Sequence, residues 1–432
     1  MITKQLLEQI EGEASVYFDL KEDKVEFASI VFPHFRGMES ILEDKNALDA
    51  LVITPRVCGI CGHAHLMATV RALEDAYKNA GYDVNLTQKV KNIREFTLLM
   101  EMVQNHFKWL YMVINPELDK LAESQGEKKV LKGAYAASLA SKAIAVFGGQ
   151  WPHSSYMVLG GVTCDPTFVE VLQAQSHLDE LIKFFEKESL GTSIEAFLAF
   201  NSCKDFKDLS SDIASVESNL IATGMHEKGF AHDRFLVIGE HSFSKPSKLK
   251  GTRSFKVDSK YVSLVDSYAP QERSYAKNAL YKDAYYEAGP LARMMASAMP
   301  VIKNMHRRYK DSAYTRVMAR IFELASILQH SKKLLEEIDI TQDSVTELPD
   351  IKSISAEGVG VVEAPRGPLL HKVSLKKGTI QSYTIITPTQ FNIGSSTVEK
   401  PTSVQQAMLG LGKDDALFAF RTFDVCSVCT TH

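Results

Sequence analysis

The sequence contains no uninterrupted apolar run of the roughly eighteen residues that a membrane-spanning helix requires. It has no excess of either charge, because 49 Lys and Arg residues face 53 Asp and Glu residues, which leaves a net charge of −4. So small a net charge gives no support to a nucleic-acid-binding surface or a polybasic membrane anchor. We therefore expect no nucleic-acid partner, and membrane contact only indirectly, through partners, if at all.

A signal peptide is also missing, since the first residues, MITKQLLEQIEGE, are acidic where a signal peptide has its apolar stretch. The chain is therefore expected to be cytoplasmic, although a chain exported in the folded state by a signal on its partner would look the same. Low-complexity tracts, internal repeats and flexible linkers are absent too. With 45% hydrophobic and 24% charged residues among 432, we predict one globular domain over residues 1–432.

Several segments have apolar residues at three- and four-residue intervals, which predicts helices. The longest, over 86–114, has a wide apolar face and is expected at the centre of the core. The predicted helices are 66–80 (ending at Gly81), 86–114, 128–146, 167–188, 289–308 and 312–337, with a short one near 402–411. Residues 14–32 and 357–390 alternate instead, which predicts hairpins or a small sheet, and 224–285 is expected to form short strands and loops. The predicted fold class is mainly α with small peripheral β-hairpins or sheets (α+β).

Four of the six cysteines form two C-x-x-C pairs, Cys58 with Cys61 and Cys426 with Cys429. Two residues between cysteines let both sulfurs turn toward one ion, and two such pairs can enclose a soft metal. Spacing alone leaves three interpretations open, namely a structural zinc site, an iron–sulfur cluster and a redox disulfide. The other two cysteines are isolated and are interpreted as small buried hydrophobic residues.

The surroundings of the pairs favour a functional site over a structural zinc site. Each pair lies beside predicted helices that are long enough to hold without a metal. The pairs come from opposite ends of the sequence, which places the site deep in the fold. The sequence stops at His432, three residues after Cys429, which indicates that the C-terminus is part of the site.

Together, these residues resemble the large subunit of nickel–iron hydrogenases. The first signature of that family, R-x-C-G-x-C-x-x-x-H, is matched from Arg56 to His65. The last, D-P-C-x-x-C-x-x-H, is matched from Asp424 to His432, except that Val425 replaces proline. Intermediate landmarks follow in order: Glu11-Gly12, Arg36-Gly37-Met38-Glu39, Pro152-His153, Ala364-Pro365-Arg366-Gly367-Pro368-Leu369 and Pro388-Thr389. The resemblance spans essentially the whole chain and implies that family's fold, with a bundle of long helices at its centre.

The resemblance implies a Ni-Fe(CO)(CN)2 centre and a magnesium ion or a similar divalent ion. Nickel would be bound by Cys58, Cys61, Cys426 and Cys429, of which Cys61 and Cys429 would also bridge to iron. Arg366 and Thr389 match positions that line the pocket of the diatomic ligands, Leu369 would supply its apolar side, and His65 would hydrogen-bond to a bridging cysteine. The magnesium-like ion would be bound by Glu39, His432 and the Ile385 carbonyl.

The activity that the resemblance implies is the interconversion of H2 with two protons and two electrons. Heterolytic cleavage of H2 needs an electron-rich metal pair for the hydride and a nearby base for the proton. Cys426 is expected to be that base, and Glu11 matches the family's relay glutamate. Arg366 is expected to polarise bound H2 or to help as a base, although its high pKa makes proton acceptance costly. Because the metal centre uses all four paired cysteines, electrons are expected to leave through a partner, by resemblance an iron–sulfur small subunit.

Three residues depart from the family's usual pattern. Glu13 replaces a frequent histidine, which predicts a rearranged proton exit, and Val425 relaxes the backbone before Cys426. Ile60 replaces a smaller valine and is expected to narrow gas access. The length fits the cytoplasmic uptake, sensory or cofactor-reducing groups. Many members are made with a tail beyond the last histidine; the end at His432 indicates either the mature form or a type made without this tail, such as the hydrogen sensors.

Two other functions remain open at this stage. A regulatory H2-sensing hydrogenase would have the same site with slow turnover. A non-catalytic, zinc-stabilised scaffold related to quinone-reductase subunits is disfavoured, because those relatives generally lose the four cysteines that this chain keeps.

Overall fold

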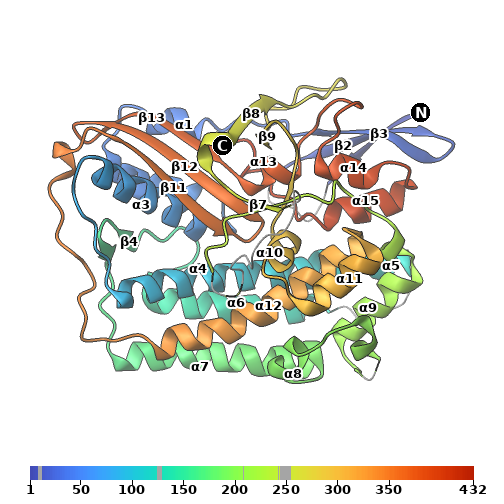
Figure 1. Ribbon diagram of the computed structural model, residues 1–432, viewed down its shortest axis with the longest axis horizontal. Coiled ribbons are helices and arrows are strands. Elements are labelled where there is room, and N and C mark those ends of the chain that lie inside the picture. Colours follow the sequence, from blue (N-terminus) through green and yellow to red (C-terminus); the bar gives the residue numbers. More distant parts are fainter. Residues whose placement is uncertain (8–11, 124–128, 208, 242, 244–253) are drawn as a thin grey trace.

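The structure is a computed structural model that describes residues 1–7, 12–123, 129–207, 209–241, 243 and 254–432. A layer of long helices lies beneath a three-stranded sheet that carries a further helix, α3 (Figure 1). A second small sheet lies at the N-terminal end of the molecule. The predicted class, mainly helical with small sheets, is confirmed.

The helices differ widely in length. The longer ones are α3 (Gly62–Asn79), α4 (Gln88–Lys108), α6 (Val130–Gly148), α7 (Phe168–Phe184), α9 (Asp212–Ala222), α11 (Pro300–Tyr309) and α12 (Ala313–Glu336). The shorter ones are α1 (Met38–Leu42), α2 (Ala50–Ile53), α5 (Asn115–Leu121), α8 (Ile194–Leu198), α10 (Pro290–Ala296), α13 (Pro388–Asn392), α14 (Ser403–Met408) and α15 (Lys413–Arg421).

The strands form small, separate sheets. The N-terminal sheet contains β1 (Ile2–Leu6), β2 (Ser15–Lys21) and β3 (Lys24–Val31), and the central antiparallel sheet contains β11 (Glu357–Ala364), β12 (Gly367–Lys376) and β13 (Thr379–Ile386). The remaining strands are β4 (Met157–Val158), β5 (Gly161–Val162), β6 (Phe235–Val237), β7 (Ser254–Lys256), β8 (Val262–Asp266), β9 (Lys277–Tyr281) and β10 (Glu287–Ala288).

The helix α4 is the centre of the helical layer, where it packs against α6 and α12 while α6 packs against α7. Its N-terminus is capped by Thr87, whose side chain accepts a hydrogen bond from the Val90 amide. The apolar positions of α4 are buried, as the sequence predicts, but so are polar residues on its other faces, including Glu101, Asn105 and His106. A polar side chain inside a core costs free energy unless it is hydrogen-bonded. The buried polar side of α4 therefore marks where a polar site enters the core.

Three predicted helices are interrupted. The one expected over 167–188 is α-helical from Phe168 to Phe184 and continues as a π-helical turn, Phe185–Leu190. The one expected over 86–114 is α-helical only to Lys108 and continues as a π-helical turn, Trp109–Ile114. The prediction of one helix over 289–308 is wrong, because α10 and α11 are separate. Ala298 between them has a positive φ of 63°, and Pro300 starts α11. Proline lacks an N–H donor and disfavours the helical conformation of the residue before it, which explains the break.

The central sheet and α3 lie unusually close together. A Cβ atom at Gly358 would lie 2.0 Å from the Ala72 carbonyl oxygen of α3, and one at Gly360 would lie 1.9 Å from that of Ala68. Only glycine permits this approach of β11 to the helix. The contact fixes the start of α3, which directly follows Cys61, relative to the turn between β11 and β12.

The C-terminal segment passes from the N-terminal sheet into the core. The predicted hairpin over 14–32 is confirmed as β2 and β3, with β1 as an additional, unpredicted strand. The Val25 amide of β3 donates to the Leu411 carbonyl, next to α14 and α15. After α15, residues 422–432 are buried except for the half-buried Val428.

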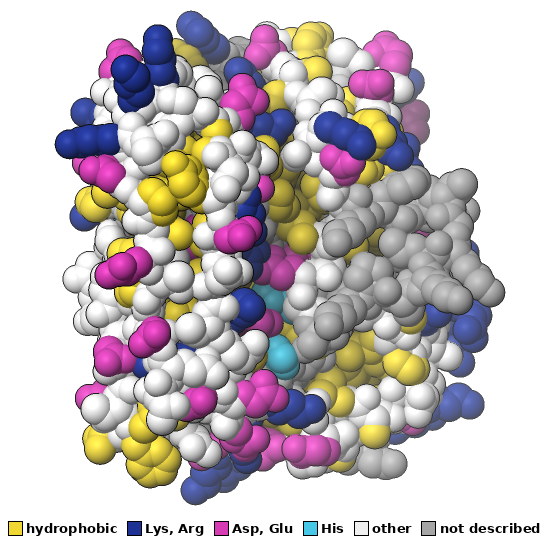
Figure 2. Space-filling model, turned by 60° about the vertical axis from the view of Figure 1, so that its left-hand side comes forward, with side chains coloured by type: hydrophobic (Ala, Val, Ile, Leu, Met, Phe, Trp, Pro, Cys, Tyr) yellow, Lys and Arg dark blue, Asp and Glu magenta, His cyan; other side chains and the backbone are white. Residues whose placement is uncertain are grey.

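One helix in the described part of the chain, α6, is long and apolar enough to span a membrane by length and composition. It packs against both α4 and α7, and core helices of helical bundles pass the same test, so this is weak evidence for a span. On the face shown in Figure 2, basic and acidic side chains are interspersed. The described side chains of that face form no extended surface of one charge.

Replacement of Gly360 by alanine tests the close approach of β11 to α3. The added methyl group would overlap the Ala68 carbonyl, and overpacking of this kind costs about 3 kcal/mol or more of unfolding free energy. The matched control is Gly412→Ala, where φ is −63° and an added Cβ meets nothing within 4 Å. Thermal unfolding should show a large loss for Gly360→Ala and a change of less than about 1 kcal/mol for the control. Equal effects of the two substitutions would contradict the packing argument.

Candidate metal centre

The first cysteine pair lies in a tight turn that leads into α3. Cys61 is the N-cap residue of this helix, and a Cβ atom at Gly62 would lie 2.8 Å from the Pro55 carbonyl oxygen. The first N–H groups of a helix have no partner within the helix. In this helix, the Glu101 carboxylate of α4 accepts hydrogen bonds from the amides of His63 (2.8 Å) and Ala64 (3.0 Å). A side chain from a second helix thus fixes the loop that carries both cysteines.

The second pair lies in a turn after α15. Asp424 has a left-handed backbone conformation with φ of 60°, which turns the chain before Cys426. The Thr430 hydroxyl donates to the Cys426 carbonyl at 2.9 Å, and the Thr430 amide donates to the Ser427 carbonyl. These local bonds direct the side chains of Cys426 and Cys429 to the same side of the turn.

The two turns bring four buried thiols together. The Sγ atoms of Cys58 and Cys426 are 3.6 Å apart, those of Cys61 and Cys429 3.2 Å, and those of Cys426 and Cys429 3.1 Å. All four cysteines are thiols, not disulfides. Among the residues that the structure describes, this cluster supplies the one group of three or more possible metal ligands within 4.8 Å of one another. The predicted meeting of the two ends of the sequence is therefore present in the fold.

The protonation of these thiols reflects their burial. Burial raises the pKa of Cys58, Cys61 and Cys429 well above the usual value. Burial opposes ionisation of Cys426 as well, but hydrogen bonds from the other three thiols and then the positive charge of Arg366 outweigh it and lower the pKa of Cys426 well below the usual value. The surroundings of the cluster thus favour ionisation of Cys426 over that of the other three thiols. A bound cation would be needed to ionise all four thiols, since burial of an uncompensated charge is costly.

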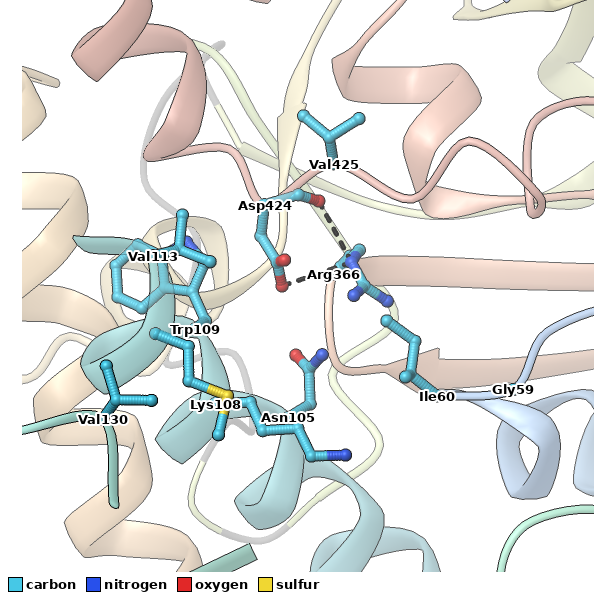
Figure 3. A pocket seen from close by; sticks show the side chains of 11 residues that line it. Gly59, Ile60, Asn105, Lys108, Trp109, Val113, Val130, Arg366, Asp424 and Val425 are labelled. Atoms are coloured by element: carbon cyan, nitrogen blue, oxygen red, sulfur yellow. Dashed lines mark hydrogen bonds and ion pairs between the residues drawn. The ribbon is translucent and has the colours of Figure 1, made fainter. Parts of the chain in front are cut away.

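Arg366 lies in the turn between β11 and β12, with its guanidinium beside Asp424 (Figure 3). Its Nε donates to the Asp424 carbonyl at 3.0 Å and lies 3.2 Å from Oδ2 of the same residue. That carboxylate also accepts from Arg320 at 2.6 Å. The Asn105 amide, oriented so that both its atoms are satisfied, donates to Asp424 and accepts from Arg366. Arg366 is buried, yet Asp424 and the neighbouring sulfurs raise its pKa, so it remains a cation.

A small cavity also borders Arg366, next to the cysteines predicted to bridge the metals. It is lined by Cys61, His65, Ala364, Pro365, Arg366, Leu369, Pro388, Thr389 and Cys429. The Thr389 hydroxyl is buried and has no hydrogen-bond partner among the described residues. A buried donor without a partner is rare and requires an explanation. This hydroxyl, the Arg366 cation and the apolar Leu369 fit small hydrogen-bond-accepting ligands on a metal held by the cysteines.

A larger pocket of about 540 Å³ reaches the same centre from the surface (Figure 3). Its inner end is formed by Asn105, Asp424 and Arg366, and the rest of its lining is apolar except for Lys108 and the Gly59 backbone. The apolar lining comes from Ile60, Trp109, Met112, Val113, Val130 and Val425. Ile60 lines this pocket, and its effect on gas access stays a prediction.

Histidine side chains extend the site behind the cysteines. His65 Nε2 lies 4.0 Å from Cys429 Sγ, and its Nδ1 is 3.0 Å from Nε2 of His371. His371 in turn bonds to the hydroxyls of Tyr383 (2.8 Å) and Thr69 (3.0 Å). Burial lowers the pKa of His65 to about 3, so its ring is neutral. His371 was not predicted, since a lone histidine in a strand carries no local signal of this contact.

The residues predicted to bind magnesium also lie together. Glu39 Oε1 accepts from the Ile385 amide at 2.6 Å and lies 3.7 Å from His432 Nε2. His432 Nε2 donates to the Ile385 carbonyl at 2.8 Å, and its Nδ1 is 2.9 Å from the Cys429 carbonyl. These contacts join the C-terminal residue to the cysteine turn. Whether the group binds an ion stays a prediction.

Glu11, the predicted proton relay, lies outside the described residues. The residues that follow it contact the second cysteine turn. The Ser427 hydroxyl donates to the Glu13 carbonyl at 2.5 Å, and a Cβ atom at Gly12 would lie 2.9 Å from Val428 Cγ1. Gly12 and Glu13 therefore lie along the turn that carries Cys426.

Glu101 is a functional candidate that the sequence did not reveal. It is fully buried, and burial raises its pKa to about 7, although amide donors and Trp151 Nε1 (3.4 Å) partly offset the effect. A single glutamate in an apolar helix pattern has no sequence feature that distinguishes it from an exposed residue. Asn105 and Arg320 were missed for the same reason.

Glu101→Gln tests this protonation. The folded chain keeps the proton up to about pH 7, whereas the unfolded chain loses it near 4.5, so the wild type loses stability as the pH rises between these values. The glutamine side chain cannot ionise and imitates the protonated form. From pH 5 to pH 8, the unfolding free energy of the variant relative to the wild type should rise by about 3 kcal/mol. Thermal unfolding across this range measures it, and a pH-independent difference would contradict the raised pKa.

Comparison with known proteins places this site in a family. The sequence model of the nickel-dependent hydrogenases matches residues 36–118 and 181–432. The large subunit of the periplasmic [NiFeSe] hydrogenase of Desulfomicrobium baculatum is 25% identical, over 95% of this chain and 89% of that protein. The beta subunit of the NAD-reducing hydrogenase HoxS of Cupriavidus necator is also 25% identical, over 98% of this chain and 93% of that protein.

Solved structures show the same fold. The reduced, active [NiFeSe] hydrogenase of Desulfomicrobium baculatum has a TM-score of 0.81 at 23% identity, and the similarity covers the whole of both chains. The match to the family model includes both cysteine pairs and the Arg366 turn. The chain therefore belongs to the nickel-dependent hydrogenase family, as a large subunit of an oxidoreductase that acts on H2.

Proposed function

We propose that this chain is the catalytic subunit of a nickel–iron hydrogenase that cleaves or forms H2 at a Ni-Fe(CO)(CN)2 centre. The observation that carries the proposal is the cluster of four buried thiols, with Sγ contacts of 3.1 to 3.6 Å, beneath the Arg366 cation. Four thiolates suit a soft metal. All four cysteines would hold nickel, and Cys61 and Cys429, which face the small cavity, would also hold iron.

The lining of the small cavity would bind the diatomic ligands of the iron. The Thr389 hydroxyl, which has no hydrogen-bond partner among the described residues, would donate to one diatomic ligand. Arg366 would donate to another, and Leu369 provides an apolar surface. His65 would bond to the bridging Cys429, which is 4.0 Å away. When bound, the metal pair supplies the electron-rich centre at which the H–H bond is polarised and cleaved.

Side chains of this chain would then accept the proton and pass it on. The pocket in Figure 3 ends at Asn105, Arg366 and Asp424. H2 that enters there would come close to Cys426, two residues after Asp424, and the Sγ of Cys426 would accept the proton. Arg366 remains a cation and, held by Asp424, presents a fixed positive charge. The contact of Glu13 with Ser427 supports Glu11 as the next proton acceptor.

A divalent cation would bind beside the C-terminus. Glu39 would supply a carboxylate oxygen, which lies 3.7 Å from His432 Nε2. The Ile385 carbonyl, 2.8 Å from the same His432 nitrogen, would supply a second oxygen. Carboxylate and carbonyl oxygens are the ligands that Mg²⁺ prefers. The ion would hold His432, and through it the Cys429 turn, in place.

Electron exit requires a partner. The two remaining cysteines, Cys164 and Cys203, belong to no ligand cluster among the described residues. Electrons would pass to an iron–sulfur small subunit. We propose a cytoplasmic heterodimer or larger assembly of this kind.

The test is infrared spectroscopy of the holoenzyme, purified with its partner, together with H2 oxidation using an artificial electron acceptor. Carbonyl and cyanide bands and turnover are expected. Bands without substantial turnover would indicate the H2-sensing alternative and overturn the catalytic assignment. A metal-loaded protein without these bands would overturn the proposed centre.

Removal of one thiol should abolish nickel binding. In Cys58→Ala the cluster loses one of four ligands, and nickel measured by elemental analysis should fall to a small fraction of the wild-type content. Cys203→Ala, which removes a half-buried thiol far along the chain, should keep the full nickel content. If both variants keep their nickel, the cysteine cluster is not the nickel site.

Arg366→Lys should separate catalysis from metal binding. Arginine bonds to Asp424 and Asn105 at once. Lysine keeps the charge but lacks the planar fork of donors that makes both bonds. Loss of a preorganised charge at the reacting atoms costs about 10²-fold or more in turnover. Nickel content should stay unchanged while H2 oxidation falls by that amount. Near-wild-type activity per nickel would contradict a catalytic role of the guanidinium.

A further inference from the structure

The turn that carries Arg366 is held by buried side chains at three successive carbonyl groups. Arg293 of α10 donates to the carbonyl oxygens of Ala364 (3.1 Å) and Pro365 (2.9 Å). Asn392 of α13 donates to the carbonyl of Arg366 itself at 3.3 Å. Turns between strands usually lie at the surface, bonded to water. This turn is instead bonded throughout to the interior of the protein.

Arg293 uses all five of its N–H donors in this arrangement. Nε and Nη2 bond to the two carboxylate oxygens of Glu323 at 2.5 and 2.8 Å, and Nη1 bonds to Glu363 at 2.9 Å. The two remaining donors bond to the turn carbonyls. Arg293 has no exposed surface. Only a planar guanidinium offers five donors in this geometry, and a lysine ammonium offers three.

The carboxylates of Glu323 and Glu363 connect Arg293 to α12, to α4 and to the residue after β6. Glu323 of α12 also lies 2.9 Å from His106 Nε2 of α4, and Glu363 accepts from the amide of Ile238 at 2.5 Å. Although burial opposes it, the Arg293 charge lowers the pKa of Glu323 to about 2. Burial lowers the pKa of His106 to about 4. Around neutral pH the ion pair is thus charged and the histidine neutral, which keeps the network in one state.

Two glycines let the opposite side of the turn pack closely. A Cβ atom at Gly289, where φ is 103°, would lie 2.7 Å from the Arg366 carbonyl oxygen. A Cβ atom at Gly367, where φ is 133°, would lie 2.8 Å from the Ala288 side chain. The backbone of the turn therefore has little freedom on either side. The part of Arg366 that extends beyond these contacts is its side chain, which points to Asp424 and the thiols.

We propose that Arg293 is a positioning residue for catalysis, which fixes the Arg366 guanidinium over the metal centre by holding the carbonyls of Ala364 and Pro365. The inference rests on the proposed role of Arg366 in H2 cleavage. It predicts that Arg293 influences turnover only through Arg366. If the Arg293 ion pair served stability alone, its loss would lower the melting temperature and leave turnover per bound nickel unchanged.

The experiment compares Arg293→Lys with Arg94→Lys in the holoenzyme. Arg94 is also buried, bonds to both carboxylate oxygens of Glu74 (2.9 and 3.3 Å) and donates to the carbonyls of Val158 and Gly161. Like Arg293, it is buried and bonds to a carboxylate and to two carbonyl groups, but it holds no part of the Arg366 turn. Both variants should lower the melting temperature. Only Arg293→Lys should reduce turnover per nickel, by about 10²-fold, and shift the cyanide stretching bands.

A double variant tests whether the effect passes through Arg366. In the Arg366→Lys background, the further change Arg293→Lys should reduce turnover little, because the group that it positions is already absent. Losses that multiply would overturn the proposal, as would wild-type turnover and bands in Arg293→Lys. If Arg293→Lys does not accumulate, Asn392→Ala takes its place, because it removes the bond to the Arg366 carbonyl. It should shift the bands and reduce turnover, each to a smaller extent. Unchanged bands and turnover would overturn the proposal.

The outcomes for the unmodified enzyme separate this inference from the proposed function. If the wild type lacks diatomic bands and turnover, the proposed function fails, and the role of Arg293 fails with it. If the wild type has both and Arg293→Lys behaves like Arg94→Lys, the positioning role alone is wrong.

Discussion

The convergence of four thiols from the two ends of the chain is the constraint on which the rest of the structure depends. Thiolates are costly to bury without a cation, so the fold surrounds them with groups that fix charge and geometry. Glu101 holds the first cysteine turn, and Asp424 holds Arg366 above the cluster. Glu101 and Asn105 of α4 and Arg320 of α12 are buried polar residues that contact this centre. The helical layer thus acts as a rigid support for one polar centre.

The sequence predicted most of the fold because long helices with one apolar face give a strong periodic signal. The bounds of α12 differ from the prediction by one residue at each end. Failures occurred where local chemistry interrupts the pattern, as between α10 and α11, where a residue with positive φ precedes Pro300. The first strand, β1, was missed because pairing with β2, not its own five residues, determines it.

The site was predictable to the extent that its residues form compact motifs. The four cysteines, Arg366 and Thr389 lie together as the resemblance implied, and so do Glu39, Ile385 and His432. Their roles stay predictions, and Glu11 lies outside the described residues. The supporting groups, such as Arg293 and Glu101, were not predictable, because each is a single polar residue inside an apolar pattern. Their partners come from distant segments, which only the folded chain brings together.

The most direct measurement is nickel K-edge X-ray absorption of the purified holoenzyme, because it reports the atoms around nickel itself. The account predicts a shell of sulfur neighbours supplied by the four cysteines and a second, heavier neighbour from the adjacent iron. A shell dominated by nitrogen or oxygen, or a protein that holds zinc in place of nickel at full occupancy, would contradict the account.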